Sequence, residues 1–195
     1  MGAPAVFFAC DTMLPGVCHR IMLSNIALIG FMGTGKSTIG RALARRLDWQ
    51  FIDTDLVIER IAGYDIPTLF VQQGEDAFRE HEARAILGLS LGERQVIATG
   101  GGAILRDENT AALRGAGLVV LLTARPDVIV SRVSRRPGQR PLLASEEQPL
   151  ARVLRLLAER GPLYQRAAHC IIDTSDRPPL AVVEEIMRSV RRWSA

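Results

Sequence analysis

Residues 30–37 of this chain read GFMGTGKS and fit the pattern G-x-x-x-x-G-K-[ST] at every fixed position. An apolar run at 26–29 comes directly before them. Residues 38–47 follow, with large apolar side chains at helical spacing. The sequence therefore predicts a buried strand, a glycine loop and a helix in that order, which is the context that a phosphate-binding loop requires.

In such a loop the backbone N–H groups enclose phosphate oxygens, and the helix N-terminus adds about half a positive charge. We expect Lys36 to reach the β- and γ-phosphates of a nucleotide, and Ser37 to offer its hydroxyl to Mg²⁺. The residues expected to bind ATP are Gly33, Thr34, Gly35, Lys36, Ser37 and Thr38.

The basic residues of the chain support this interpretation over a chance match in a plain glycine turn. Lys36 is the only lysine among 24 Lys and Arg residues. Arginine carries charge equally well at solvated positions, but its wide fork does not replace a compact ammonium inside a phosphate loop. Lysine at this one position therefore points to the phosphate-binding role.

Composition favours one globular domain that binds small anionic ligands. The chain has 195 residues, is 48% hydrophobic and carries a net charge of +3, without a basic stripe interleaved with aromatic residues. Its three cysteines, Cys10, Cys18 and Cys170, show no metal-ligand or disulfide spacing, which fits a reducing cytoplasm. No apolar run approaches a membrane span. We expect a cytoplasmic monomer that binds neither nucleic acid nor membrane.

Residues 1–21 differ from the rest because they lack periodicity. The apolar run at 5–10 superficially resembles a lipoprotein cleavage site, but no basic residue precedes it and its apolar core is too short for a signal peptide. We expect either a disordered leader or a start codon placed too early, with Met22 as the natural beginning. A single domain is expected over residues 22–195.

Strand and helix patterns alternate from Ser24 onward. Apolar runs predict five strands, at 26–29, 51–53, 95–99, 118–122 and 170–173. Helices are predicted at 38–47, 56–61, 67–73, 75–87, from a capping Asp107 to 113, from Pro126, at 150–164 with a break at 161–162, and at 180–193. The predicted fold is α/β, with a five-stranded parallel sheet covered by helices on both faces.

Residues 135–149 interrupt this alternation with four Pro and Gly residues among scattered charges. A connection of this length in a compact domain is usually functional or mobile. We expect a mobile lid over about 135–150, which ligand binding would order and which would exclude water when closed.

Ligands of open α/β sheets gather beyond the carboxyl ends of the strands. Asp53 and Asp55 follow the second predicted strand, and three glycines, 100–102, follow the third. Asp53 is expected to hold the metal with Ser37, the alternative being a helix cap. Asp55 could accept a proton from a substrate hydroxyl or orient it. The glycines leave room for a ligand to contact the backbone.

The spacing of the arginines does not by itself indicate a binding site. Arg79 has Glu75 one turn before it and Glu82 one turn after it, and on spacing alone a solvated ion-pair face is expected. The same solvated interpretation applies to Arg140 and Arg160.

In combination, these segments resemble the shikimate kinases, and the resemblance covers nearly everything from Ile26 to the C-terminus. The matching segments are residues 30–38, FIDTD at 51–55, GExxFRxxE at 74–82, TGGG at 99–102, RPLL at 140–143 and RGPLY at 160–164.

The resemblance implies a nucleoside-monophosphate-kinase-like P-loop fold and transfer of the γ-phosphoryl group of ATP to the 3-hydroxyl of shikimate, with Mg²⁺, in aromatic amino-acid (chorismate) biosynthesis. Asp55, Arg79, Gly101 and Arg160 match the family's shikimate-binding positions. Arg79 and Arg160 would clamp the carboxylate, with Glu82 orienting Arg79. Arg140 matches the lid arginine that reaches the ATP phosphates, and with Lys36 and Asp55 it completes the implied catalytic set.

One position departs from the family pattern. The family usually places an arginine before the lid that stacks on adenine, and an ungapped count back from Arg140 reaches Val133. Arg132 or Arg135 could take this role if the lid carries a small insertion or deletion.

Two other functions were weighed against this one. A related small-metabolite kinase for gluconate or a nucleoside monophosphate would share the phosphate loop, but Arg79, Arg160 and Asp55 suit a hydroxy acid better. A non-catalytic ATP-binding regulatory module would have no need of the acidic residues and clamp arginines.

Overall fold

The computed structural model describes residues 24–134 and 148–193, and the structural findings below concern those residues. Arg135, Arg140, Met22, Cys10, Cys18, the predicted leader at 1–21 and most of the predicted lid lie outside them. Five parallel strands form one sheet in the order β2-β3-β1-β4-β5. The strands are β1 (Asn25–Ile29), β2 (Gln50–Asp53), β3 (Gln95–Ala98), β4 (Gly117–Thr123) and β5 (Cys170–Asp173).

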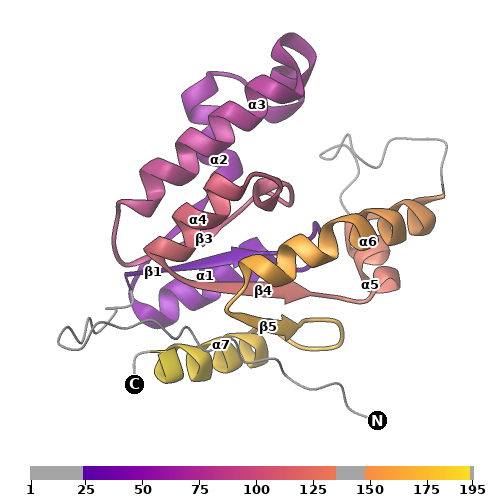
Figure 1. Cartoon of the computed structure of the whole chain (residues 1–195). Coiled ribbons are helices and arrows are strands. Elements are labelled where there is room, and N and C mark those ends of the chain that lie inside the picture. The colour runs from indigo at the N-terminus through magenta and orange to yellow at the C-terminus, as the bar shows by residue number, and fades with distance from the viewer. Residues whose placement is uncertain (1–23, 135–147, 194–195) are drawn as a thin grey trace.

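Helices cover both faces of this sheet, as predicted (Figure 1). They are α1 (Lys36–Leu47), α2 (Thr54–Ala62), α3 (Ile66–Ser90), η1 (Ala103–Leu105), α4 (Asp107–Ala116), α5 (Pro126–Ser134), α6 (Pro149–Ala167) and α7 (Pro179–Trp193). One face packs against α1 and α7, and the other against α3, α4 and α6. The predicted α/β architecture is therefore confirmed.

Strand alternation explains the two-sided core. Successive side chains on a strand point to opposite faces. In β1, Ile26 and Leu28 join the core beneath α1 and α7, while Ala27 and Ile29 join the core beneath α4 and α6. Because both faces are buried, β1 is continuously apolar after Asn25, as strands of covered parallel sheets are.

Gly74 interrupts α3 where the sequence predicts one helix to end and another to begin. Its φ of 81° and ψ of 179° are not helical, so the chain kinks there between two helical segments. The N-terminal segment packs with α2 through Leu69, and the C-terminal segment reaches the sheet through Ile86.

Two predicted details are wrong. The expected break at Gly161–Pro162 is absent, because α6 runs through Pro162 to Ala167. Pro162 removes one backbone bond, but its flanks are held by the buried side chains of Leu156 and Tyr164. Asp107 is not the cap of α4: Arg106 occupies that position without a side-chain bond, and Asp107 lies in the first turn.

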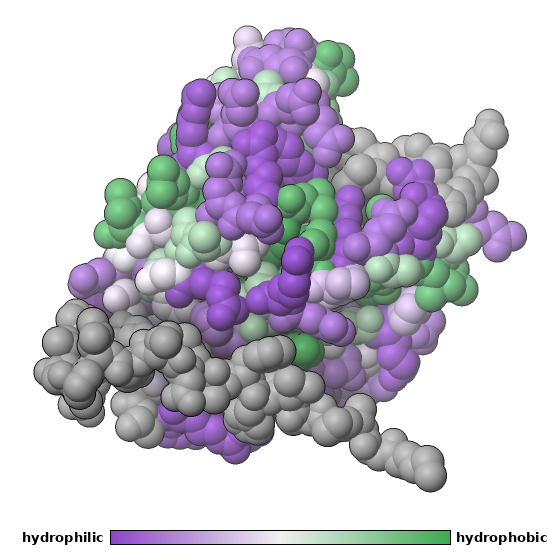
Figure 2. Space-filling view, viewed as in Figure 1, coloured by the Kyte–Doolittle hydropathy of each residue, from purple (hydrophilic) through white to green (hydrophobic). Residues whose placement is uncertain are grey.

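No helix within 24–134 or 148–193 is long and apolar enough to cross a membrane. On the face drawn in Figure 2, hydrophobic side chains lie in separate groups between hydrophilic ones.

His169 takes part in the pairing of β4 with the chain entering β5. Its backbone N–H donates to the Val119 carbonyl at 2.8 Å, and its Nδ1 accepts from the Val119 N–H at 3.0 Å. The Trp193 ring lies 4.4 Å away. Burial, with a smaller contribution from Arg114, lowers the pKa of His169 to about 4. The folded protein therefore holds His169 neutral, as an acceptor, through the mildly acidic range.

We predict that His169 makes stability depend on pH between about 6.5 and 4. The unfolded chain protonates His169 near pH 6.5 and the folded chain only near pH 4, so acidification favours unfolding. Stability is fully present above pH 6.5, and on the order of 3 kcal/mol is lost by pH 4. Urea unfolding at several pH values should show a flatter profile for His169→Asn, whose amide oxygen also accepts a hydrogen bond. Identical profiles would contradict this.

Candidate active site

The carboxyl ends of β2, β3 and β1 lie next to one another, and the predicted site segments begin there. β1 leads into the loop at 30–35, β2 into Asp53–Asp55, and β3 into the glycines at 100–102. Parallel pairing in one register places these three segments on the same edge of the sheet, as expected for ligand sites in open α/β folds.

The loop at 30–37 ends directly on α1. Gly33 and Gly35 have φ of 79° and 94°, and Gly35 occupies the N-cap position in the left-handed region, where side chains are disfavoured. The first N–H groups of α1 have no partner within the helix, and no side chain at the N-cap position bonds to them. Lys36 Nζ donates to the carbonyl oxygens of Gly30 at 2.8 Å and Phe31 at 2.9 Å, which holds its ammonium against the loop.

Asp53 caps α2, and its other carboxylate oxygen contacts Ser37. Its Oδ1 accepts from the Asp55 N–H at 3.3 Å and caps α2. Its Oδ2 accepts from the Ser37 hydroxyl at 2.8 Å. A carboxylate oxygen and a hydroxyl oxygen thus meet at the first turn of α1.

Gly100 and Gly102 leave room for three charged side chains. A Cβ at Gly102 would lie 2.4 Å from Nη1 and 2.6 Å from Nη2 of Arg79. A Cβ at Gly100 would lie 2.9 Å from Glu82 Oε1 and 3.1 Å from Asp55 Oδ1. The space that two missing side chains leave is therefore occupied by one guanidinium and two carboxylates.

Arg79 is not on a solvated face, so the expectation from its spacing is wrong. Its side chain is 11% exposed, and its Nη1 lies 2.8 Å from a carboxylate oxygen of Glu82, whose side chain is 1% exposed. Its Nη2 lies 3.0 Å from Glu75, which is 61% exposed. The kink at Gly74 and the packing of Phe78 turn this helix face inward.

Glu82 is a buried acid with one oxygen in use. Burial raises the pKa of the Glu82 carboxyl, and the Arg79 guanidinium opposes that rise. Its Oε1 is buried and has no hydrogen-bond partner among the described residues. A buried polar oxygen without a partner, facing Gly100, suggests that a ligand or water completes this position.

Tyr164 lies beside the glycines at 100–102, and the sequence presents it only as the end of a motif. Its hydroxyl donates to the Gly101 carbonyl at 2.5 Å, and its side chain is buried. Burial raises the pKa of Tyr164 to about 12, with Arg160, one turn earlier on α6, opposing the shift. Tyr164 therefore stays protonated and ties α6 to the middle glycine.

Arg132, on α5, also contacts the phosphate loop. It donates to Gly33 O at 3.2 Å and to Thr174 O at 2.7 Å, so its guanidinium borders the loop. Arg135 and Arg140 lie outside the described residues.

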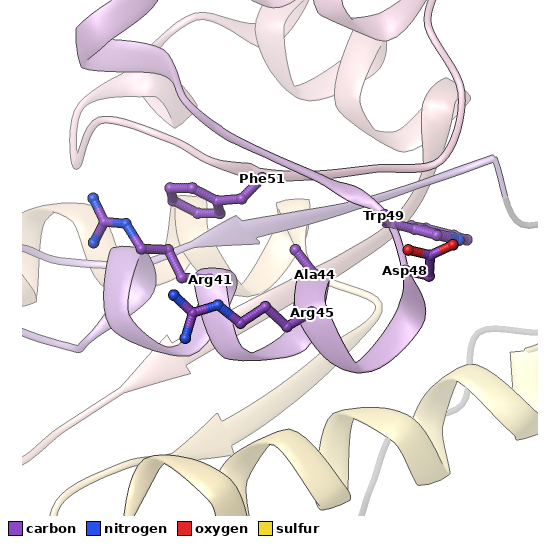
Figure 3. Close-up of a pocket in the computed structure, with 6 residues that line it drawn as sticks. All are labelled: Arg41, Ala44, Arg45, Asp48, Trp49 and Phe51. Carbon is purple, nitrogen blue, oxygen red and sulfur yellow. The ribbon is translucent and has the colours of Figure 1, made fainter.

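A separate hollow of about 420 Å³ lies along α1 and the beginning of β2. Arg41, Ala44, Arg45, Asp48, Trp49 and Phe51 line it. In Figure 3, Arg41 and Arg45 extend away from Trp49 and Asp48, and Arg41 lies over the Phe51 ring at 5.0 Å. These side chains do not converge on one point, and none belongs to the predicted site.

Comparison with known proteins identifies the family. The family model described as shikimate kinase matches residues 32–191. The chain belongs to the shikimate kinase family. A shikimate kinase from Symbiobacterium thermophilum is 44% identical over 86% of this chain and 96% of its own length. The structure of an Acinetobacter baumannii shikimate kinase in complex with shikimate has a TM-score of 0.83 and 38% identity, and covers 87% of this chain and 94% of its own.

The chain is therefore an ATP-dependent kinase of aromatic amino-acid biosynthesis, as predicted. A gluconokinase from Sinorhizobium meliloti has a TM-score of 0.55 at 19% identity, covering 88% of this chain and 93% of its own, which shows a shared fold only. Neither the related-kinase alternative nor the non-catalytic alternative fits this membership.

We predict that the two acidic partners of Arg79 differ sharply in their contribution to stability. Glu82→Ala would leave a partly buried guanidinium without its buried partner and lower the free energy of unfolding by about 3 kcal/mol. Glu75→Ala removes an exposed partner of the same arginine and should cost less than about 1 kcal/mol. Urea unfolding followed by circular dichroism measures both. Equal losses would contradict a buried pair.

Proposed function

We propose that this chain transfers the γ-phosphoryl group of ATP to the 3-hydroxyl of shikimate at the shared ends of β1, β2 and β3. Residues 33–38 bind the phosphates of ATP, and Asp55, Arg79, Gly101 and Arg160 bind shikimate. Family membership and the meeting of these segments at one edge of the sheet support the assignment.

The carboxylate of shikimate is bound by Arg79 and Arg160. Arg79 presents a planar fork, which suits bidentate recognition of a carboxylate. Its ion pair with Glu82 and its position over Gly102 fix the plane of that fork before substrate arrives. Arg160 lies close enough for its charge to act on both Glu82 and Tyr164. Two guanidinium groups therefore border the same small volume.

Asp55 binds ring hydroxyls and accepts or orients the proton of the attacking one. Its Oδ1 lies at Gly100, beside the buried carboxylate of Glu82. The Glu82 oxygen that has no partner among the described residues can accept a bond from a substrate hydroxyl or a bridging water. This pocket offers acceptors for hydroxyls and donors for a carboxylate, which matches a hydroxy acid.

Mg²⁺ fits the oxygen pair of Ser37 and Asp53. Magnesium in kinase sites is held by one or two carboxylates together with substrate phosphates, rather than by a cage of protein ligands. When bound, the ion would neutralise charge that develops on the phosphates.

The remaining assignments complete the proposal. Lys36 contacts the β- and γ-phosphates, and Arg140, from the lid, stabilises charge on the transferring group. Residues 22–195 form the single kinase domain. One chain supplies every proposed residue, so a cytoplasmic monomer is sufficient for the activity.

We predict that Arg79→Ala lowers kcat/KM for shikimate at least about 100-fold, because a desolvated charge partner of the carboxylate is lost. Arg84→Ala is the matched control, since Arg84 lies on the same helix and is 69% exposed. The assay is ADP release with ATP and Mg²⁺, with and without shikimate. Arg79→Lys keeps the charge beside Glu82 and tests the fork without unpairing that acid. Wild-type activity in Arg79→Ala would contradict the proposal that Arg79 binds the carboxylate of shikimate.

A further inference from the structure

Arg132, near the C-terminal end of α5, is anchored by several hydrogen bonds. Its guanidinium makes four hydrogen bonds: Nη1 to Gly33 O at 3.2 Å and Thr174 Oγ1 at 3.1 Å, and Nη2 to Thr174 O at 2.7 Å and Ser175 O at 3.1 Å. These acceptors come from the phosphate loop and from the turn after β5. Arg132 therefore joins α5, the loop and that turn.

Gly33 also packs directly on α5. A Cβ at Gly33 would lie 3.1 Å from Val133 Cγ2 and 3.3 Å from the Ile129 carbonyl oxygen. Gly33 of the phosphate loop thus packs against the turn of α5 that carries Arg132.

Thr174 holds the next peptide of the loop. It is 2% exposed, and its Oγ1 lies 3.0 Å from Thr34 O and 2.9 Å from Thr123 O. A hydroxyl has one proton, so it donates to one of these carbonyls at a time. Arg132 donates to the same oxygen and thereby directs the hydroxyl proton toward the carbonyls.

Because a peptide is planar, a contact with its C=O also orients its N–H group. The C=O and N–H of a trans peptide point in opposite directions. A bond to the Thr34 carbonyl therefore points the Gly35 N–H in the opposite direction, away from Thr174. A bond to the Gly33 carbonyl holds the preceding peptide, whose Thr34 N–H donates to Phe31 O at 3.4 Å within the loop. Lys36 Nζ binds two other carbonyls of the loop, those of Gly30 and Phe31.

We propose that Arg132 and Thr174 are positioning residues that hold the carbonyls of Gly33 and Thr34, and so fix the shape of the phosphate loop and direct the Gly35 N–H at the triphosphate. This inference rests on the proposed binding of ATP phosphates at residues 33–38. It assigns Arg132 to the phosphate half of the nucleotide site. Preorganised donors lower the cost of binding because they need no ordering when the ligand arrives.

The experiment compares the affinity of the intact enzyme for ATP with its affinity for magnesium tripolyphosphate, which has the phosphates but no base. Arg132→Met should weaken both about 10-fold, while Arg132→Lys retains part of each. The ratio of kcat/KM for ATP to that for GTP should stay at the wild-type value. Thr174→Val should behave like Arg132→Met, and Thr174→Ser, which keeps the hydroxyl, should restore binding.

Arg177→Met is the matched control. Arg177 lies in the same region and donates to the carbonyls of Asp173 and Ala181, but it makes no described contact with the phosphate loop. It should leave tripolyphosphate affinity unchanged, and thermal unfolding of every variant checks the fold.

Weaker ATP binding with unchanged tripolyphosphate binding would assign Arg132 to the base and overturn the proposal. Equal losses in Arg177→Met would overturn it as well. Shikimate affinity without nucleotide reports separately on the proposed substrate site, because neither Arg132 nor Thr174 contacts it.

Discussion

The site depends on the absence of two side chains at the end of β3. The Arg79 guanidinium occupies the position of a Cβ on Gly102, and the carboxylates of Glu82 and Asp55 border that of Gly100. A side chain at either position would displace the ends of these charged side chains. β3 contributes no charged side chain, but the glycines that follow it leave the space in which the charged side chains of α2 and α3 lie.

Charge balance explains why so many ionic groups share this small volume. Arg79, Arg160 and Lys36 suit a carboxylate and a polyphosphate, but without ligands they repel one another. Glu82 is bonded to Arg79 and Asp53 to Ser37, and Asp55 lies beside Glu82. These acids offset the positive charge in the free protein. Because Glu82 is buried, its negative charge also fixes the position of Arg79, whereas the exposed Glu75 adds little.

Much of this could be read from the sequence. The alternation of apolar runs and helical patterns gave the five strands, and strand ends located Asp53, Asp55 and the glycines. For Asp53 the sequence does not show that one carboxylate makes two contacts: it caps α2 and also accepts a hydrogen bond from Ser37. Pro162 shows that a local helix breaker is overruled when both flanks are buried.

What the sequence could not supply was the direction of side chains over long separations. The spacing of Arg79 is that of a surface ion pair, and it is the kink at Gly74 and the packing of Phe78 that turn it inward. The sequence placed Tyr164 at the end of a motif and Arg132 among the candidates for an adenine contact, but it did not indicate the contacts that the structure shows for either residue. Their partners, Gly101 and Gly33, lie 63 and 99 residues away, and nothing local records such contacts.

The most direct test of this account is the dissociation constant of shikimate for Gly102→Ala, measured by calorimetry without nucleotide. The added methyl group would displace only the flexible end of Arg79, so the fold and tripolyphosphate affinity should be retained. We expect shikimate binding to weaken at least about 10-fold, as loss of one charge-assisted hydrogen bond does. Wild-type affinity for shikimate in this variant would contradict the account, because Arg79 would then not need its place at Gly102.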